Sequence, residues 1–358
     1  MLTRVVINDN SFSAAYVCTF LNCAYGRAQA YQHASGTTRD RVLLINQREF
    51  LVPLVQIQLQ GLIESCLDQS RQKDKQAADT YKQAETLLLD ALDLTGFSPS
   101  TENTNIKSFQ ESFGVSGRLD AEYYQPKFDE LEAKIAETHK LVSLGSLLTL
   151  NQCGTQPDYA GEGLPVINSK HVREGEVVLS DNRFATLPDK ETPLIIQMGD
   201  VLINGTGVGT IGRSAPYLHE HNAIPDNHVT ILRTDKLNPI FLSVYLNSIA
   251  GKYQVDKYFK GSSGQIELYP KDIDCFYVPL VDEAIQAEIA ALVQQSFTLK
   301  AESERLLEAA KHAVEIAIEQ DEQAAISFLE KTAAAAKNQT GNMRGRVSIF
   351  HKEGPFEN

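Results

Sequence analysis

The amino-acid sequence predicts an α+β fold, in which a compact, mostly β domain is combined with two long helices that form an antiparallel coiled coil. Three observations predict this fold. Two regions of the 358-residue chain resemble each other, each ends in a helical stretch with heptad spacing, and short β-type runs fill the sequence between them. The alternative is two ordinary amphipathic helices packed on a core, but their equivalent positions favour the coiled coil.

An internal repeat relates residues 14–92 to residues 239–318 with one single-residue gap. Matching pieces occur in the same order in both copies, which indicates one structural module used twice. These pieces are Thr19-Phe20-Leu21-Asn22 before Gly26 and Val244-Tyr245-Leu246-Asn247 before Gly251, then Ser35-Gly36-Thr37-Thr38 and Gly261-Ser262-Ser263-Gly264, then Phe50-Leu51-Val52-Pro53-Leu54 and Phe276-Tyr277-Val278-Pro279-Leu280.

Each copy continues into a long helix, predicted over residues 55–95 in the first copy and 283–336 in the second. Pro53 and Pro279 precede these helices, where a missing N–H costs little. Residues recur along each helix at alternating steps of four and three, which keeps one face turned to a partner helix. They are Leu59, Ile63, Cys66, Ser70, Lys73, Ala77, Thr80, Ala84, Leu87 and Ala91 in the first helix, and Ile285, Ile289, Leu292, Ser296, Leu299, Ser303, Leu306 and Ala310 in the second.

The segments around the helices differ in character. Residues 1–54 match only the last third of the domain that precedes the second helix, and residues 141–282 are predicted to be that complete, mostly β domain. Its β-type runs lie between Gly, Pro, Asn and Asp residues; the clearest are residues 164–167, 176–179, 200–203 and 228–232. Residues 96–140 are predicted as a linker with a lead-in helix over 121–140, and residues 337–358 as a flexible tail.

The charge balance restricts how the chain could bind nucleic acid. It has 33 Lys and Arg against 46 Asp and Glu, a net charge of −13, and residues 141–282 alone hold 11 basic and 16 acidic residues. Nucleic-acid binders usually carry a basic stripe, so any DNA surface must be a local patch with salt-dependent affinity. A basic partner subunit could supply further phosphate contacts.

The sequence indicates a cytoplasmic protein. No apolar run reaches the ~18 residues of a membrane span, and the N-terminus lacks the pattern of a secretory signal. The five cysteines are scattered, and we expect reduced thiols. No catalytic triad, carboxylate pair or activated cysteine stands out, so we expect no enzymatic activity. Four histidines fall within residues 141–282 without a second ligand pair at metal-binding spacing, so we expect no metal site.

A glycine-rich stretch, Gly207-Val208-Gly209-Thr210-Ile211-Gly212, fits the spacing of a dinucleotide-binding turn. That turn needs a helix directly after the glycines, and Pro216 prevents one of useful length. We therefore expect a glycine-rich hairpin. Whether it is only a turn, or a loop whose bare backbone approaches a phosphate or a base edge beside Arg213, stays open at this point.

Taken together, the chain resembles the specificity subunits of type I restriction-modification systems over roughly residues 10–335. The resemblance is strongest in the residues around the glycine-rich stretch and in the second copy of the repeat. These are Gly199-Asp200-Val201-Leu202-Ile203-Asn204-Gly205-Thr206-Gly207, Gly212-Arg213, Asn227-His228-Val229, Leu246-Asn247-Ser248, Lys260-Gly261-Ser262-Ser263-Gly264-Gln265-Ile266, Val278-Pro279-Leu280 and the lead-in from Arg118 to Pro126.

The resemblance implies that residues 141–282 are a target recognition domain, which reads one half of a split double-stranded DNA site. The long helices would then be a spacer and a docking surface for methyltransferase subunits, with a restriction subunit as a further candidate partner. S-adenosylmethionine, ATP and magnesium would belong to those partners and not to this chain. Adenine methylation, and restriction where a nuclease is present, would be directed by this subunit.

One departure from the family pattern concerns residues 1–54, since family members usually carry two complete recognition domains. A half-size subunit that works as a homodimer, an inactive remnant and the product of a rearranged gene all remain open. A two-fold homodimer would present two identical domains and read a symmetric split site.

Candidate contact residues follow from the motifs and from the chemistry of DNA recognition. Lysines suit phosphates, whereas Arg, Asn, Gln and His suit base edges. The DNA candidates are Lys170, His171, Arg173, Asn204, Thr206, Gly207, Arg213, Asn227, His228, Lys257, Lys260, Ser262, Ser263 and Gln265. The candidates for binding a partner subunit are Ile285, Ile289, Leu292, Leu299 and Leu306.

Two other functional classes compete with DNA recognition. The acidic charge and the heptads also fit a non-enzymatic coiled-coil adaptor that binds only protein. A nucleotide-dependent enzyme that uses the glycine-rich stretch is the second rival. Protein binding without DNA affinity, even inside a complex, would favour the adaptor over DNA recognition. A cofactor titration would test the nucleotide-dependent enzyme.

Overall fold

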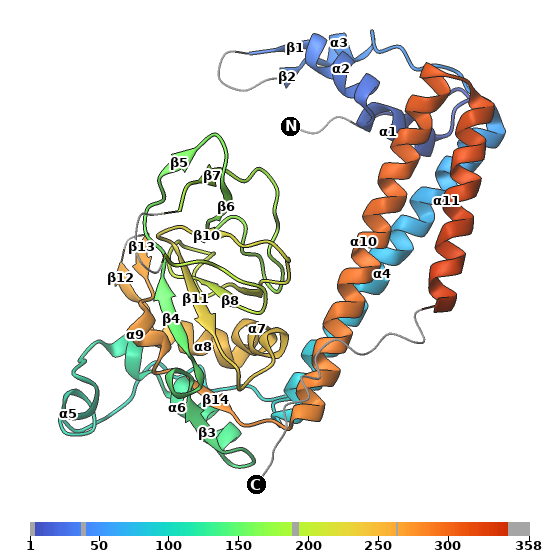
Figure 1. Cartoon of the computed structure of the whole chain (residues 1–358). Coiled ribbons are helices and arrows are strands. Elements are labelled where there is room, and N and C mark those ends of the chain that lie inside the picture. The colour runs from blue at the N-terminus through green and yellow to red at the C-terminus, as the bar shows by residue number, and fades with distance from the viewer. Residues whose placement is uncertain (1–3, 37–40, 188–192, 263, 343–358) are drawn as a thin grey trace. The chain divides into compact units, whose positions relative to one another are not determined.

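In the computed structural model, the described residues are 4–36, 41–187, 193–262 and 264–342. They divide into two compact units, which are formed by residues 1–78 with 297–358 and by residues 79–296. The long helices α4 (Ile57–Ala91) and α10 (Glu283–Glu319) each pass from one unit into the other. The predicted α+β fold with two long paired helices is confirmed (Figure 1).

The first unit is mainly helical. It contains a two-helix corner, a short hairpin, the first part of α4, the last part of α10 and a further helix. The corner is formed by α1 (Ala14–Asn22) and α2 (Ala24–Gln32), and the hairpin by the antiparallel strands β1 (Ala34–Ser35) and β2 (Arg41–Val42). The short helix α3 (Leu44–Gln47) precedes α4, and the further helix is α11 (Glu322–Asn342).

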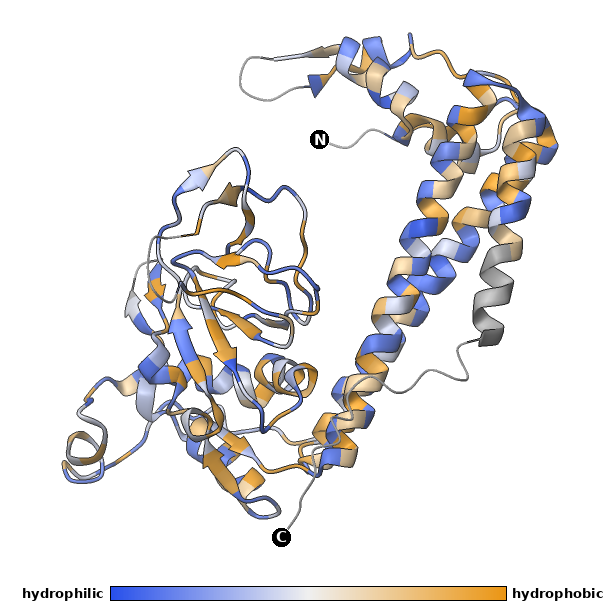
Figure 2. Ribbon diagram, viewed as in Figure 1, coloured by the Kyte–Doolittle hydropathy of each residue, from blue (hydrophilic) through white to orange (hydrophobic). Residues whose placement is uncertain are grey.

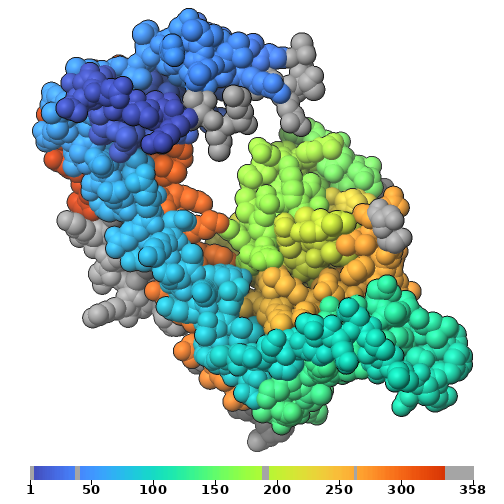
Figure 3. All heavy atoms as spheres, turned by 180° about the vertical axis from the view of Figure 1, so that it is seen from behind, coloured from blue at the N-terminus to red at the C-terminus, as the bar shows by residue number. Residues whose placement is uncertain are grey.

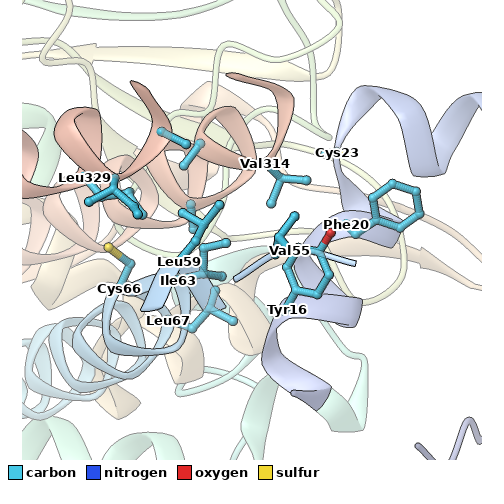
Figure 4. Packing of buried hydrophobic residues seen from close by; sticks show 14 of the residues in the cluster. Tyr16, Phe20, Cys23, Val55, Leu59, Ile63, Cys66, Leu67, Val314 and Leu329 are labelled. Carbon is cyan, nitrogen blue, oxygen red and sulfur yellow. The ribbon is translucent and has the colours of Figure 1, made fainter. Parts of the chain in front are cut away.

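The core of this unit forms where α1, α4, α10 and α11 meet. Figure 4 shows Tyr16 of α1 beside Val55, with Leu59 and Ile63 of α4 on the side away from Phe20 and Val314 of α10 across from them. Further along, the Ser70 and Ser303 hydroxyls lie 2.9 Å apart, and Lys73 pairs with Glu302 at 2.6 Å. From the first pair to the second, the residue number rises in α4 and falls in α10, so the helices are antiparallel, as their equivalent positions in the repeat predicted.

The second helix differs from its prediction over residues 283–336. α10 ends at Glu319, and α11 starts at Glu322. The reason is local: the Asp321 carboxylate accepts the Ala324 N–H at 2.8 Å, which caps a new helix. Ile326 and Leu329 of α11 are then buried against the α4 residues of the same core. The residues predicted as a tail begin inside α11, and residues 343–358 lie outside the described part of the chain.

The second unit combines small sheets with seven short helices that precede α10 in the described part of the chain. Its helices are η1 (Ala121–Tyr124), η2 (Leu144–Leu147), α5 (Phe113–Ser116), α6 (Pro126–Ala136), α7 (Pro239–Asn247), α8 (Ile249–Tyr258) and α9 (Pro270–Ile273). Its strands are β3 (Leu141–Ser143), β4 (Leu150–Cys153), β5 (Tyr159–Ala160), β6 (Leu164–Ile167), β7 (Phe184–Ala185), β8 (Val201–Asn204), β9 (Ser214–Pro216), β10 (Ile224–Pro225), β11 (Val229–Arg233), β12 (Lys260–Ser262), β13 (Gln265–Glu267) and β14 (Tyr277–Pro279).

A four-stranded sheet of order β4-β11-β8-β9 forms the centre of this unit. β11 is paired on both edges, antiparallel to β4 and to β8, and the residues of β8 and β11 are mostly apolar (Figure 2). α7 packs against β9 and β8. Before β8, the buried Asp200 carboxylate accepts two hydrogen bonds from the Arg233 guanidinium at 2.7 and 2.9 Å, which ties the start of β8 to the end of β11.

The predicted strands and the lead-in helix agree in part with the structure. The runs at 164–167, 200–203 and 228–232 correspond to β6, β8 and β11, whereas 176–179 forms only a single bridge, from Val177 to Val172. The predicted helix over 121–140 is broken, because Pro126 keeps Gln125 extended and α6 starts after it. Figures 1 and 3 show α5 within a segment that projects from the rest of this unit.

The internal repeat is visible in atomic detail. The order α1, α2, hairpin, α3, α4 in the first copy matches α7, α8, hairpin, α9, α10 in the second. Gln60 accepts the Ser13 N–H and donates to the Val55 carbonyl. The equivalent Gln286 accepts the Asn238 N–H and donates to the Val281 carbonyl. Both copies therefore share one hydrogen-bonded framework.

Candidate nucleic-acid interface

Several loops of the second unit meet at one edge of its central sheet. β4 and β8 end at this edge and β11 begins there, since Thr230 is opposite Cys153 and Val229 is opposite Asn204. The loop after β4, the glycine-rich stretch after β8 and the turn before β11 therefore leave the sheet together. We call this group of loops, with the β12–β13 hairpin, the loop edge.

Hydrogen bonds hold the parts of the loop edge together. The Thr206 hydroxyl and His228 Nδ1 lie 2.9 Å apart, and Gly205 N–H donates to the His228 carbonyl. Thr206 also forms a bridge to Glu267 of β13, and Leu268 N–H donates to the Gly205 carbonyl at 2.8 Å. The structure thus brings Thr206, Asn227, His228 and the β12–β13 hairpin into one place.

The glycine-rich stretch is the turn of the β8–β9 hairpin and leads into a strand, not a helix. Gly207 has φ of 95° and Gly209 of 77°, which a residue with a side chain would rarely adopt. Gly212 lies so close to Val255 of α8 that an added Cβ would approach a methyl carbon to 2.6 Å. The hairpin is therefore fixed at its base, and Val208 is exposed at its tip.

Two predicted contact residues, His171 and Asn204, are buried in the folded chain. Asn204 donates to the carbonyls of Ser169 and Val172, which ties the loop over 168–176 to β8. His171 Nδ1 accepts the Asn168 N–H at 3.0 Å in the same loop. Burial, and then the nearby Lys170 charge, lower the pKa of His171 below its usual value, so its neutral form is favoured. Both side chains hold the loop in place rather than face solvent.

Two predicted phosphate contacts are engaged with carboxylates. Lys257 of α8 lies 3.7 Å from Asp129 and 3.8 Å from Glu132 of α6. These ion pairs connect the lead-in helix α6 to α8. Lys260 pairs with Asp272 at 2.7 Å. Ser262 is in β12, its side chain is not described, and Ser263 lies outside the described residues.

The remaining predicted cations lie on two loops. Lys170 and Arg173 are exposed, and the Lys170 ammonium donates to the Asp181 carbonyl at 3.2 Å. Arg213 is half-buried at the end of the glycine-rich stretch, where its carbonyl accepts the Asn204 N–H. The sequence analysis missed Arg183, whose guanidinium lies 3.3 Å from the centre of the Tyr159 ring. Stacking orients this cation without neutralising it, so it is suited to a phosphate.

Sequence analysis also missed polar residues that follow β4. Thr155 and Gln156 are exposed in the loop that leaves the sheet beside Asn227. The Gly154-Thr155-Gln156-Pro157 cluster is a turn signal, but the mixed composition of β4 concealed the strand before it. Gln265 is exposed in β13. The loop edge therefore presents neutral hydrogen-bonding groups, which suit base edges better than phosphates.

The Asp226 carboxylate supports the turn before β11. It is buried and accepts the His228 N–H at 2.9 Å. Burial raises the pKa of Asp226 above its usual value, and the hydrogen bond partly opposes this effect. The carboxylate thus positions the backbone of His228.

The predicted partner-binding residues on α10 are used within the chain to different extents. Ile289 and Leu306 are buried, whereas Ile285, Leu292 and Leu299 are half-buried. No group of three or more potential metal-ligating side chains occurs among the residues that the structure describes. Within the same residues, no helix has the length and apolar character needed to span a membrane.

The comparisons with known proteins gave one curated match and several structures. The chain is 29% identical over 166 residues to the type I restriction enzyme EcoKI specificity subunit of Escherichia coli strain K12. This match covers 44% of the chain and 36% of the relative, so the chain spans about a third of that protein's length. The resemblance to type I specificity subunits is thereby confirmed. No family model matches.

The comparison with solved structures also gave matches. The HsdS subunit from Thermoanaerobacter tengcongensis is 17% identical, with 86% of this chain and 70% of that chain covered and a TM-score of 0.34. The type I restriction-modification S subunit from M. genitalium is 11% identical, with 90% and 74% covered and a TM-score of 0.41.

Proposed function

We propose that this chain is a DNA-recognition subunit of a type I restriction-modification complex and does no chemistry of its own. The β-rich second unit would read one half of a split DNA site. The long helices would set the spacing and bind methyltransferase subunits. In such a cytoplasmic complex, S-adenosylmethionine, ATP and magnesium would act on the partner subunits, and a restriction subunit could join them.

One observation carries this proposal: four loops converge at the loop edge, and three of them carry exposed neutral polar side chains, which are Thr155 and Gln156, Asn227, and Gln265. Asn227 and Gln265 can each donate and accept hydrogen bonds, which is the pairing that adenine offers in the major groove. Their backbones are fixed by the Thr206–His228 contact and by the Thr206–Glu267 bridge. Fixed donors and acceptors lose little entropy on binding, so they can discriminate between bases.

Phosphate contacts in this proposal come from three exposed cations outside the loop edge. Lys170, Arg173 and Arg183 would serve this role, since Lys257 and Lys260 already form ion pairs with carboxylates. With few such contacts and a net charge of −13, the chain alone should bind DNA weakly. A more basic methyltransferase partner would strengthen binding.

The test is to co-express the chain with its methyltransferase subunit and to map methylated adenines in host DNA by long-read sequencing. A split motif that disappears on deletion of the chain is expected. Asn227→Ala and Gln265→Ala should relax one half of that motif. Asn222→Ala is the matched control, because Asn222 is also exposed but lies beyond the opposite end of β9, and it should leave the motif unchanged.

The adaptor alternative is favoured by the acidic charge and by the ion pairs of Lys257 and Lys260, and the same experiment separates it. An adaptor would give a stable complex with no methylation motif that depends on this chain.

In DNA-binding assays with the methyltransferase present, Arg183→Ala should weaken the binding of all DNA sequences alike and lower the salt slope by about one. An unchanged salt slope would contradict a phosphate role for Arg183.

A further inference from the structure

The first copy of the repeat and the segment before it line an apolar hollow of about 470 Å³. Its walls come from the segment before α1, from α1 and α2, and from the residues around α3. The lining residues are Val5, Ile7, Phe12, Val17, Leu21, Ala30, Val42, Gln47, Phe50 and Val52. Among the described residues of this unit, several apolar side chains nearby are strongly exposed: Val5, Val6, Leu51 and Leu54.

The second copy shows what such a surface packs against. The repeat aligns Val17, Leu21, Ala30, Val42, Phe50 and Val52 with Leu242, Leu246, Val255, Leu268, Phe276 and Val278. Every one of these second-copy residues is buried, whereas in the first copy only Val17 is. The difference arises because α7 is packed against β8 and β9, and Gly212 of their hairpin touches Val255.

The polar residues at this contact are also retained in the first copy. In the second copy, Asn247 accepts the Ser214 N–H and donates to the Ser214 carbonyl, and Ser243 donates to the same carbonyl. This arrangement clamps the backbone of β9. The repeat places Asn22 at the position of Asn247 and Cys18 at that of Ser243. Both are exposed, and the Asn22 amide donates to the Cys18 carbonyl instead.

A strand-like segment precedes α1 in the same register. Arg4-Val5-Val6-Ile7-Asn8 aligns with β11, and both segments continue into the same local turn. Ser11 N–H donates to Asp9 in one copy, and Lys236 N–H donates to Thr234 in the other. β11 is paired on both edges, whereas residues 4–8 form no strand pairing within the described part of the chain.

We infer that the hollow is a receptor for a further β domain built like residues 141–228 of this chain. Its strands would pair with residues 4–8, and its β9-like strand would be clamped by Asn22 and Cys18. The chain's own sheet is not available for this role, because β11 already fills its central position and α7 covers β9. A second copy of the chain presents the same filled sheet. This inference does not depend on DNA binding.

The test uses the full chain together with a probe polypeptide of residues 119–228 of the same sequence. The two are co-expressed in one arm, and the probe is fused ahead of residue 1 by a flexible linker in a second arm, which keeps it at high local concentration. In both arms the rate of Cys18 alkylation should fall by about tenfold or more, because the thiol becomes buried. Cys275, which is exposed in the second copy, serves as the internal control.

Matched variants sharpen the result. Asn22→Ala and Leu21→Asp should restore the alkylation of Cys18, whereas Ile106→Asp, at a residue that is 94% exposed in the second unit, should not. Unchanged Cys18 reactivity in both arms would overturn the proposal. So would protection of Cys18 in the chain alone with a mass of two full-length chains, since a second copy would then occupy the hollow.

Discussion

The two copies of the repeat share their internal framework but differ in what covers them. In both copies, a glutamine near the start of the long helix, Gln60 or Gln286, accepts the N–H of the residue that caps the first helix. The same glutamine donates to a carbonyl in the segment just before the long helix. In the second copy the sheet buries the outer face of α7, whereas the corresponding face of α1 is largely open. Local capping and corner contacts therefore set the module, and a sheet is not needed to form it.

The largest effect should come from the glycines at the two helix corners. An added Cβ at Gly251 would lie 2.2 Å from the Leu246 oxygen, and one at Gly26 would lie 2.2 Å from the Phe20 oxygen. The corner must open in either case. We expect Gly251→Ala to cost about 2–4 kcal/mol and Gly26→Ala about 1–2 kcal/mol, because α1 can shift toward its open face while α7 is held by the sheet.

Urea unfolding combined with hydrogen exchange of α1 and α7 measures this difference. The exchange data assign each loss to its own unit, so the two variants can be compared directly. Equal losses in the two copies would contradict the idea that the open face leaves α1 freedom to move.

The second prediction concerns the aligned asparagines. Asn247→Ala should destabilise the second unit by about 1–3 kcal/mol, because it leaves the buried Ser214 N–H and carbonyl with fewer partners. Asn22→Ala should change stability by less than about 0.5 kcal/mol in the isolated chain, since Asn22 is exposed. Thermal unfolding of both variants provides the measurement. A large loss for Asn22→Ala would mean that its side chain already has a structural role.

Sequence patterns predicted the repeated parts of the fold better than the connections. The heptads identified buried positions such as Leu59, Ile63 and Leu306, because a repeating apolar spacing reports directly on a shared seam. The break at Gln320 and Asp321 was missed, since no Gly or Pro marks it and the cap of Asp321 depends on where α11 can pack.

The candidate site was predicted in part for a related reason. The motifs marked Thr206, Asn227 and His228 singly, and the structure brings them together because strand pairing fixes which loops share an edge. Residue type alone does not report burial or pairing. Asn204 and Lys257 have suitable chemistry for DNA, but one is buried in β8 and the other lies beside the acidic residues of α6.

The third prediction tests the polar layer of the coiled coil in the first unit. The Ser303 hydroxyl donates to the Ser70 carbonyl at 2.8 Å, and the two hydroxyls are 2.9 Å apart. The repeat aligns Ser70 with Ser296 and Ser303 with Ala77. Of these two equivalent layers, only the Ser70–Ser303 layer has serine on both helices. Either single change to alanine should cost about 1 kcal/mol, and the double change should cost less than the sum. A double-mutant cycle in urea measures the coupling, and strict additivity would exclude an interaction between the hydroxyls.

The smallest effect should be a pH dependence confined to the second unit, where the buried His171 has no counterpart in the first copy. Its pKa is lowered by burial and by Lys170, so the folded state favours the neutral ring. The resulting stabilisation is fully present above the ordinary pKa of 6.5 and is lost as the pH falls below it, because the unfolded chain then takes up the proton first.

The raised pKa of Asp226 acts in the opposite direction, so wild type must be compared with His171→Gln, which can still accept the Asn168 N–H. Between pH 7.5 and 5.5, the wild-type second unit should lose more stability than the variant in urea unfolding; parallel pH profiles would show that His171 does not resist protonation.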